Sequence, residues 1–122
     1  INLVRTYFAG VDGEDLEKIF STFTEDCRFS VETHGVELRG RDAISGMFER
    51  LWSNHATVRH NNFRFVVDPT HGNISVQFRV TNTFDSGDQV YKSNCNFFTT
   101  RDGLFDTVAV YMAGENTLDR AD

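Results

Sequence analysis

The apolar positions in the first half of the chain recur three or four residues apart, which is helical spacing. They predict three helices, with apolar faces made of Leu3, Val4, Tyr7, Phe8 and Val11; of Leu16, Ile19, Phe20 and Phe23; and of Ile44, Met47, Phe48, Leu51 and Trp52. The run Gly10–Gly13 predicts a break after the first helix. Between the second and third helices, residues 27–31 and 36–38 predict a short hairpin that turns at His34 and Gly35.

In the second half the apolar residues alternate with polar ones, which predicts strands. Four strands joined by short turns indicate an antiparallel meander, and helices followed by strands indicate an α+β fold. We expect a curved antiparallel sheet wrapped around three N-terminal helices, a cone of the cystatin-like roll type. The residues predicted to face inward are Phe63, Phe65, Val67, Ile74, Val76, Phe78, Val80, Asn82, Tyr91, Ser93, Cys95 and Phe97, and those predicted to face outward include Gln77, Thr81, Asn94, Asn96 and Phe98.

Length and composition narrow the class of protein. A chain of 122 residues has the length of one domain, so we expect a single domain over residues 1–122. Twelve phenylalanines and one proline exclude a disordered chain, which is poor in aromatic residues. Two cysteines are too few for a disulfide scaffold, and no apolar run is long enough to span a bilayer.

The charge balance restricts the partners. The net charge is −6 and the basic residues are scattered, so neither nucleic acid nor an anionic membrane surface is an expected partner. Two cysteines are more typical of reduced thiols, which favours the cytoplasm. The chain begins at Ile1, and we expect the natural first residues to be missing.

The weakly polar outer row of the sheet predicts a homodimer through that face, because charged residues are depleted at interface cores. The alternative is an ordinary solvated face.

Three segments carry a resemblance to a known family. The runs at residues 7–16, 23–26 and 38–44 are similar to those of the nuclear transport factor 2 superfamily, and within it to the SnoaL-like and ketosteroid-isomerase-like members. The resemblance covers nearly the whole chain. It implies an α+β cone, usually a homodimer, with a pocket for one small, mostly apolar molecule. Members differ in activity, so function must be argued from the site.

Tyr7, Asp12 and His60 are the candidate catalytic residues. Tyr7 lies on the predicted apolar helix face and could turn its hydroxyl into the cone. The stretch around His60 is similar to the scytalone-dehydratase-like and bile-acid-dehydratase-like branch, where a His at this place pairs with an Asp five residues after the Tyr, the position of Asp12. A carboxylate on one imidazole nitrogen fixes the tautomer and leaves the other nitrogen to carry a proton. The alternatives are a core tyrosine, a helix-capping aspartate and a histidine at a strand end.

The sequence departs from the ketosteroid isomerases themselves. Val31 and Cys95 stand where those enzymes carry their two catalytic acids, so steroid isomerisation by that mechanism is not expected. Glu32 would replace the first acid only if the short hairpin slipped by one residue. Cys95 is interpreted as a small core residue rather than a nucleophile.

The remaining candidates are binding residues, and no metal or cofactor is expected because the histidines have no metal-ligand spacing. The candidate substrate-binding residues are Phe48, Trp52, Phe63, Phe78, Asn82, Cys95 and Val110. Two hypotheses follow. One is a cofactor-independent dehydratase (a lyase) or isomerase acting on a small hydrophobic oxygenated compound. The other is a non-catalytic ligand-binding or dimerisation domain of the same fold, so whether the chain is an enzyme stays open.

Overall fold

The computed structural model describes residues 1–54 and 57–113 and confirms the predicted α+β fold. The elements are α1 (Asn2–Asp12), α2 (Leu16–Phe20), β1 (Phe23–Val31), the short 3-10 helix η1 (Glu32–His34), β2 (Val36–Arg39), α3 (Gly40–Asn54), β3 (Thr57–Asp68), β4 (Asn73–Thr83), β5 (Gln89–Arg101) and β6 (Leu104–Tyr111). No helix within these residues is long and apolar enough to cross a membrane.

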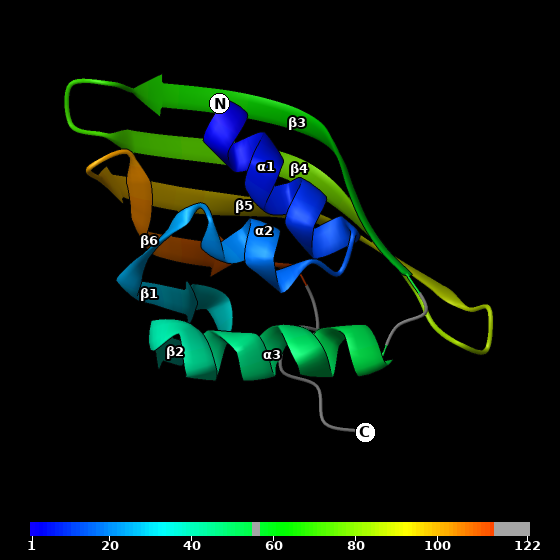
Figure 1. Cartoon of the computed structure of the whole chain (residues 1–122). Helices are drawn as coiled ribbons and strands as arrows, with labels where there is room; N and C mark the ends of the chain where they lie inside the picture. Colours follow the sequence, from blue (N-terminus) through cyan, green and yellow to red (C-terminus); the bar gives the residue numbers. More distant parts are fainter. Residues whose placement is uncertain (55–56, 114–122) are drawn as a thin grey trace.

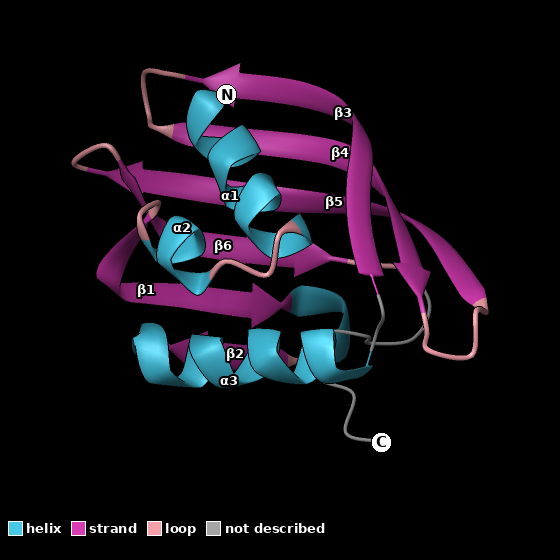
Figure 2. Ribbon diagram, turned by 45° about the vertical axis from the view of Figure 1, so that its right-hand side comes forward, coloured by secondary structure: helices cyan, strands magenta, loops and turns pink. Residues whose placement is uncertain are grey.

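The six strands form one sheet in the order β2-β1-β6-β5-β4-β3. The predicted meander β3 to β6 and the predicted hairpin β1–β2 are antiparallel, whereas β1 and β6 pair in parallel. The sheet curves, and the three helices lie on its concave side, α1 across β3 to β5 and α3 beside β1 and β2 (Figures 1 and 2). The helices therefore cover the inner face of a cone.

The predicted break falls where the run Gly10–Gly13 placed it, because α1 ends at Asp12 and Gly13 caps it. Gly10 is needed for packing rather than for a turn. A Cβ atom added there would lie 2.8 Å from Cγ1 of Ile19, so only glycine lets α2 approach α1 this closely. Gly10 therefore lies inside the helix, and the chain leaves α1 at Gly13. The sequence pattern also assigned Phe23 to the second helix, but it is the first residue of β1.

A β-bulge divides β3 into two parts that would otherwise present opposite faces. The pairing of β3 with β4 shifts between Asn61 and Arg64, and Asn62 has a φ of 57°. Asparagine tolerates this left-handed conformation better than most residues. Because of the extra residue, His60 before the bulge and Phe63 after it both reach Phe8 of α1, with ring centroids 4.7 and 5.2 Å away.

The sequence pattern assigned the side chains of β5 to the wrong faces: the residues expected to face inward face outward, and those expected to face outward face inward. Asn94, Asn96 and Phe98 are buried, whereas Phe97 is 51% exposed and Cys95 is partly exposed. Asn96 pairs with Val76 on one side and with Val110 on the other, both buried core residues. The inner face of β5 is therefore polar at its centre, and aromatic side chains lie on its outer face.

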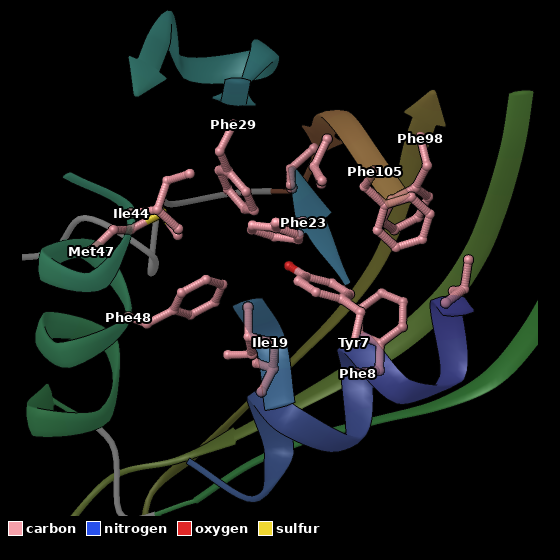
Figure 3. Packing of buried hydrophobic residues seen from close by; sticks show 14 of the residues in the cluster. Tyr7, Phe8, Ile19, Phe23, Phe29, Ile44, Met47, Phe48, Phe98 and Phe105 are labelled. Atoms are coloured by element: carbon pink, nitrogen blue, oxygen red, sulfur yellow. The ribbon is translucent and has the colours of Figure 1, made fainter. Parts of the chain in front are cut away.

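The core is built largely from aromatic rings, as Figure 3 shows. Those that are fully buried are Phe23, Phe29, Phe48, Phe98 and Phe105. The rings meet mainly edge to face or tilted, for example Phe29 on Phe48 at 5.8 Å and 77°. Such pairs contribute roughly 0.5–1.5 kcal/mol beyond the area they bury. Most of the phenylalanine excess therefore fills the cone, and the space left inside it is small.

Candidate functional site

Asp12 and His60 meet where the C-terminal end of α1 crosses the beginning of β3. One carboxylate oxygen of Asp12 lies 2.5 Å from Nδ1 of His60, and the other accepts the backbone N–H of His60 at 2.9 Å. The His60 side chain is only 10% exposed and that of Asp12 is 28% exposed. Both carboxylate oxygens thus bond to one residue, which is held at its ring and at its backbone.

This arrangement selects one tautomer of His60. An ionised carboxylate can only accept hydrogen bonds, so Nδ1 must carry the proton that lies between the two groups. Nε2 is then the nitrogen with a free lone pair, and it can take up a proton. Because Asp12 faces the imidazole directly, it also stabilises the positive charge that forms when Nε2 is protonated. The pair can therefore act as a general base.

Tyr7 lies in the core on the inner face of α1, with 3% of its surface exposed. Its ring contacts Phe8 at 4.9 Å and stacks on Phe23 at 5.7 Å, and its oxygen points into the space between Phe23 and Phe48 (Figure 3). Burial raises the pKa of Tyr7 far above its ordinary value, and the nearby Cys27 and Asp12 raise it further. The phenol therefore stays protonated and can act as a hydrogen-bond donor.

Trp52 joins α3 to the end of α1. Its indole N–H donates to the carbonyl oxygen of Val11 at 3.1 Å, and its ring stacks on Phe48 at 5.7 Å. Val11 directly precedes Asp12, so this hydrogen bond fixes the backbone that carries the carboxylate. Trp52 thereby supports the Asp12–His60 pair from α3.

A cavity of about 30 Å³ opens between α1, α3 and the sheet. The described residues that line it are Tyr7, Phe8, Val11, Phe48, Leu51, Val58, His60, Phe78, Val80, Asn82, Asn94, Asn96, Val110 and Met112. Its walls combine apolar side chains with the polar groups of Tyr7, His60 and three asparagines. A space of this size holds about two water molecules, so a larger ligand requires side chains to move.

Of the predicted site residues, Tyr7, His60, Phe48, Phe78, Asn82 and Val110 line this cavity, and Asp12 reaches it through His60. Three predicted binding residues are not among its described lining. Trp52 donates to Val11, and Phe63 packs against Phe8. Cys95 lies on the outer face of the sheet, because the side chains of β5 face the opposite side from the one predicted. Glu32 lies in η1, 4.0 Å from Arg28, and does not line the cavity.

Asn94 and Asn96 were missed by the sequence pattern. Polar and aromatic residues alternate along this segment, and in such a pattern the aromatic residues normally face the core. The two asparagines were therefore assigned to the outer face. The signal that could have located them is the segment before β5, whose length sets the pairing with β4. Within residues 1–54 and 57–113 no three His, Cys, Asp or Glu side chains gather closely enough to hold a metal ion.

Comparison with known proteins gives a consistent picture. The sequence model of the SnoaL-like domain matches residues 4–107. No curated protein matches the chain. Among solved structures, a candidate polyketide cyclase from Xanthomonas campestris pv. campestris is 17% identical, with a TM-score of 0.82 over 90% of this chain and 87% of that one.

Two further solved structures contain small molecules. A hypothetical protein of ketosteroid isomerase-like fold from Catenulispora acidiphila, in complex with trimethylamine, is 14% identical, with a TM-score of 0.79 over 89% of this chain and 83% of that one. TerC, co-crystallised with polyporic acid, is 17% identical, with a TM-score of 0.78 over 89% of this chain and 87% of that one. At these identities the likeness shows a shared fold.

Proposed function

Because the chain belongs to the SnoaL-like domain family, we propose that its cavity binds a small hydrophobic oxygenated molecule and that His60 transfers a proton on it. The observation that carries this proposal is the pair of bonds between Asp12 and His60, one to the ring and one to the backbone, which holds the imidazole against the cavity. A histidine that served only packing would not need both oxygens of a carboxylate. TerC, a solved structure of the same fold co-crystallised with polyporic acid, supports the oxygenated ligand class, whereas the complex with trimethylamine supports only the binding of a small molecule.

The proposed chemistry is a dehydration or an isomerisation without a cofactor. Nε2 of His60 removes a proton from a carbon next to a carbonyl or hydroxyl group, and Asp12 stabilises the imidazolium that results. In a dehydration the carbon–oxygen bond breaks, a double bond forms, and the departing hydroxyl leaves as water with that proton. In an isomerisation the proton returns to another carbon. Tyr7 donates a hydrogen bond to the oxygen that gains negative charge.

The aromatic ring of Phe8 lies beside both proposed catalytic side chains. Phe8 contacts Tyr7 and His60 at ring distances of 4.9 and 4.7 Å. A substrate that uses both residues is therefore expected to contact the ring of Phe8 as well. To admit a molecule larger than the cavity, side chains that line it must be displaced, and the unbranched Met112 among them adapts readily to new contacts.

The small cavity supports a second candidate function, a non-catalytic ligand-binding or dimerisation domain. Pockets that bind drug-sized ligands usually have volumes of roughly 300 Å³ or more, well above the 30 Å³ seen here. In that case the Asp12–His60 pair would only fasten β3 to α1. The two unpaired cysteines support the proposed cytoplasmic location under either function.

The experiment that separates the two functions measures turnover on a panel of small enones and hydroxy-ketones. His60→Ala should abolish turnover while the circular dichroism spectrum stays unchanged. His71→Ala is the matched control, because His71 also pairs with an aspartate, Asp68, but on the exposed β3–β4 hairpin. Turnover by the wild type that survives in His60→Ala would exclude His60 as the base. Binding without turnover across the panel would favour the non-catalytic domain.

A further inference from the structure

Lys92 on β5 is a buried charged residue that the proposed chemistry does not use. Among residues 1–54 and 57–113 it is the only Asp, Glu, Lys or Arg that is buried, with 9% of its surface exposed. The other lysine of the chain, Lys18, is exposed on α2. Lysine is rarely buried to this extent, because moving an ammonium group out of water is costly unless oxygen atoms surround it. The position of Lys92 therefore calls for an explanation in terms of its charge.

The alternation of β5 turns Lys92 toward the inside of the cone. Lys92, Asn94 and Asn96 are buried, and the residues that alternate with them are more exposed. Side chains two residues apart on a strand lie on the same face, and both asparagines line the cavity. The reversal of β5 that buries the asparagines thus also brings a lysine to the inner face.

Lys92 lies directly beside the described lining of the cavity. It pairs with Val80 on β4, and Asn82 is its diagonal neighbour on that strand. Val80, Asn82 and Asn94 all line the cavity. The ammonium group of lysine stands on a flexible stem of four carbons, which gives it a long reach. A molecule that fills the cavity and extends along Val80 therefore comes within reach of the ammonium group.

The same row of the sheet contains the proposed base. Val80 pairs with Lys92 on one side and with His60 on the other, so these three residues lie side by side on three neighbouring strands. Directly opposite residues of antiparallel strands lie about 4.5–5.5 Å apart at their Cα atoms, which places the Cα atoms of His60 and Lys92 roughly 10 Å apart. One small molecule can span the distance between the two side chains.

We propose that Lys92 is a specificity-determining residue that binds the carboxylate group of an acidic substrate, while the carbonyl or hydroxyl group of that substrate faces His60. This inference rests on the proposed function and specifies its substrate class as a small oxo or hydroxy carboxylic acid. An ammonium group has three donors, so it can donate to a carboxylate and to protein oxygens at the same time. Hydrogen bonds between ionised groups are stronger than those between neutral groups, which makes the charge a means of selection.

The test compares para-acetylbenzoate with para-acetylbenzamide, two ligands of nearly the same shape that differ in charge. Dissociation constants are measured by protein NMR titration at neutral pH. We expect the wild type to bind the acid about tenfold to hundredfold more tightly than the amide. Lys92→Met keeps the length of the side chain without its charge and should bind the two ligands about equally. Lys92→Arg keeps the charge and should retain a preference for the acid.

Lys18→Met is the matched control, because it removes the other lysine of the chain from an exposed position. It should keep the wild-type ratio of the two affinities. A lysine that only stabilised the fold would change both affinities together and leave their ratio unchanged, so the ratio separates the two roles. Lys92→Gln repeats the titration should the methionine variant fail to fold.

Acetate is a second probe that does not require the cavity to open. With only two lysines in the chain, NMR distinguishes their ammonium nitrogens by comparison with Lys18→Met. Acetate should shift the nitrogen signal of Lys92 and leave that of Lys18 in place, and chloride at the same ionic strength should shift neither.

Equal affinities of the wild type for the acid and the amide would overturn the inference, and so would a preference for the acid that survives in the neutral variants of Lys92. If neither aromatic ligand binds, an unshifted Lys92 signal in acetate overturns it. None of these results affects the role of His60. Conversely, His60→Ala should keep the preference for the acid while losing hydrogen exchange at the acetyl methyl group, so failure of the proposed function is recognised separately.

Discussion

Asp12 and His60, 48 residues apart in the sequence, are joined through both carboxylate oxygens, one on the ring and one on the backbone. The second bond matters as much as the first, because it positions the strand as well as the imidazole. A shift of β3 along α1 would break both bonds together. The proposed base is therefore held by the packing of a helix against a strand, and its geometry should respond to changes on either element.

Asp12→Asn should convert His60 to the opposite tautomer, because the amide oxygen is needed to accept the backbone N–H of His60 and the NH₂ group then donates to Nδ1. Turnover should fall roughly 10²- to 10⁴-fold while the fold is kept. Nitrogen-15 NMR of the imidazole reports the tautomer directly. Asp15→Asn is the control, since Asp15 only caps α2 by accepting the N–H of Lys18. An unchanged imidazole spectrum in Asp12→Asn would contradict the assignment.

Trp52→Phe should destabilise the protein by about 1 kcal/mol, because it removes the indole bond to Val11 but keeps an aromatic ring on Phe48. Urea unfolding followed by circular dichroism measures the loss. We also expect weaker protection of the His60 amide in hydrogen exchange, since the backbone before Asp12 is less firmly held. Full protection of that amide would show that Trp52 does not support the site.

Stability should decline above about pH 9. Burial raises the pKa of Cys27 from 9.0 to about 12, so between these values the unfolded thiol loses its proton while the folded one keeps it. The unfolded state then binds fewer protons, and the free energy of unfolding falls as the pH rises. The raised pKa of Tyr7 extends the same trend above pH 10.

Urea unfolding at several pH values from 8 to 11 measures this decline. Cys27→Ala should be less stable at every pH, because a buried side chain is truncated, but its stability should depend less on pH between 9 and 10. A slope identical to that of the wild type would show that the Cys27 thiol does not contribute. Tyr7→Phe should in turn flatten the curve above pH 10.

We propose that a second copy of the chain covers the outer face of the sheet. Phe97 on β5 and Val66 on β3 are 51% and 70% exposed on this face. Both pair with Ser75 of β4, which lies between them. Along β3, Arg64 lies on one side of Val66 and Asp68 on the other. A two-fold axis through this row would place Arg64 of each copy opposite Asp68 of the other, which is the charge complementarity that a symmetric interface needs.

Phe97→Asp should convert the dimer to a monomer in light scattering after gel filtration, and Ser53→Asp on the exposed side of α3 should not. Arg64→Asp should weaken the dimer, and adding Asp68→Arg should restore it. Cys95 lies next to these residues on the outer face, so its alkylation should slow as the protein concentration rises. A wild type that is monomeric at millimolar concentration would exclude this interface.

Most of the fold could be predicted because helical spacing and strand alternation are local properties of the sequence. The apolar face of α1, the meander and the pairing of β1 with β2 all follow from them. The spacing of Tyr7, Asp12 and His60 was visible through a family resemblance, and the structure brings Asp12 and His60 together. What the sequence could not show is that Trp52 reaches the backbone next to Asp12, since that contact depends on the angle between two helices.

The errors arose where local rules conflict with tertiary packing. Phe23 continues the apolar spacing of the second helix, but it is the first residue of β1. On β5, Phe97 is exposed while Asn96 is buried, the reverse of the usual preference, so alternation alone gave the opposite face. Such reversals are expected at binding sites and interfaces, where stability is not the only requirement.

The bulge at Asn62 has a consequence for how this site tolerates insertions and deletions. Deleting that one residue would give β3 an uninterrupted ladder with β4, a change that ordinarily regularises a strand. The pairs on either side of the bulge, His60 with Val80 and Phe65 with Val76, would keep their register, so His60 would still face the cavity. In this strand the bulge absorbs one extra residue, and losing that residue would leave the orientation of the proposed base unchanged.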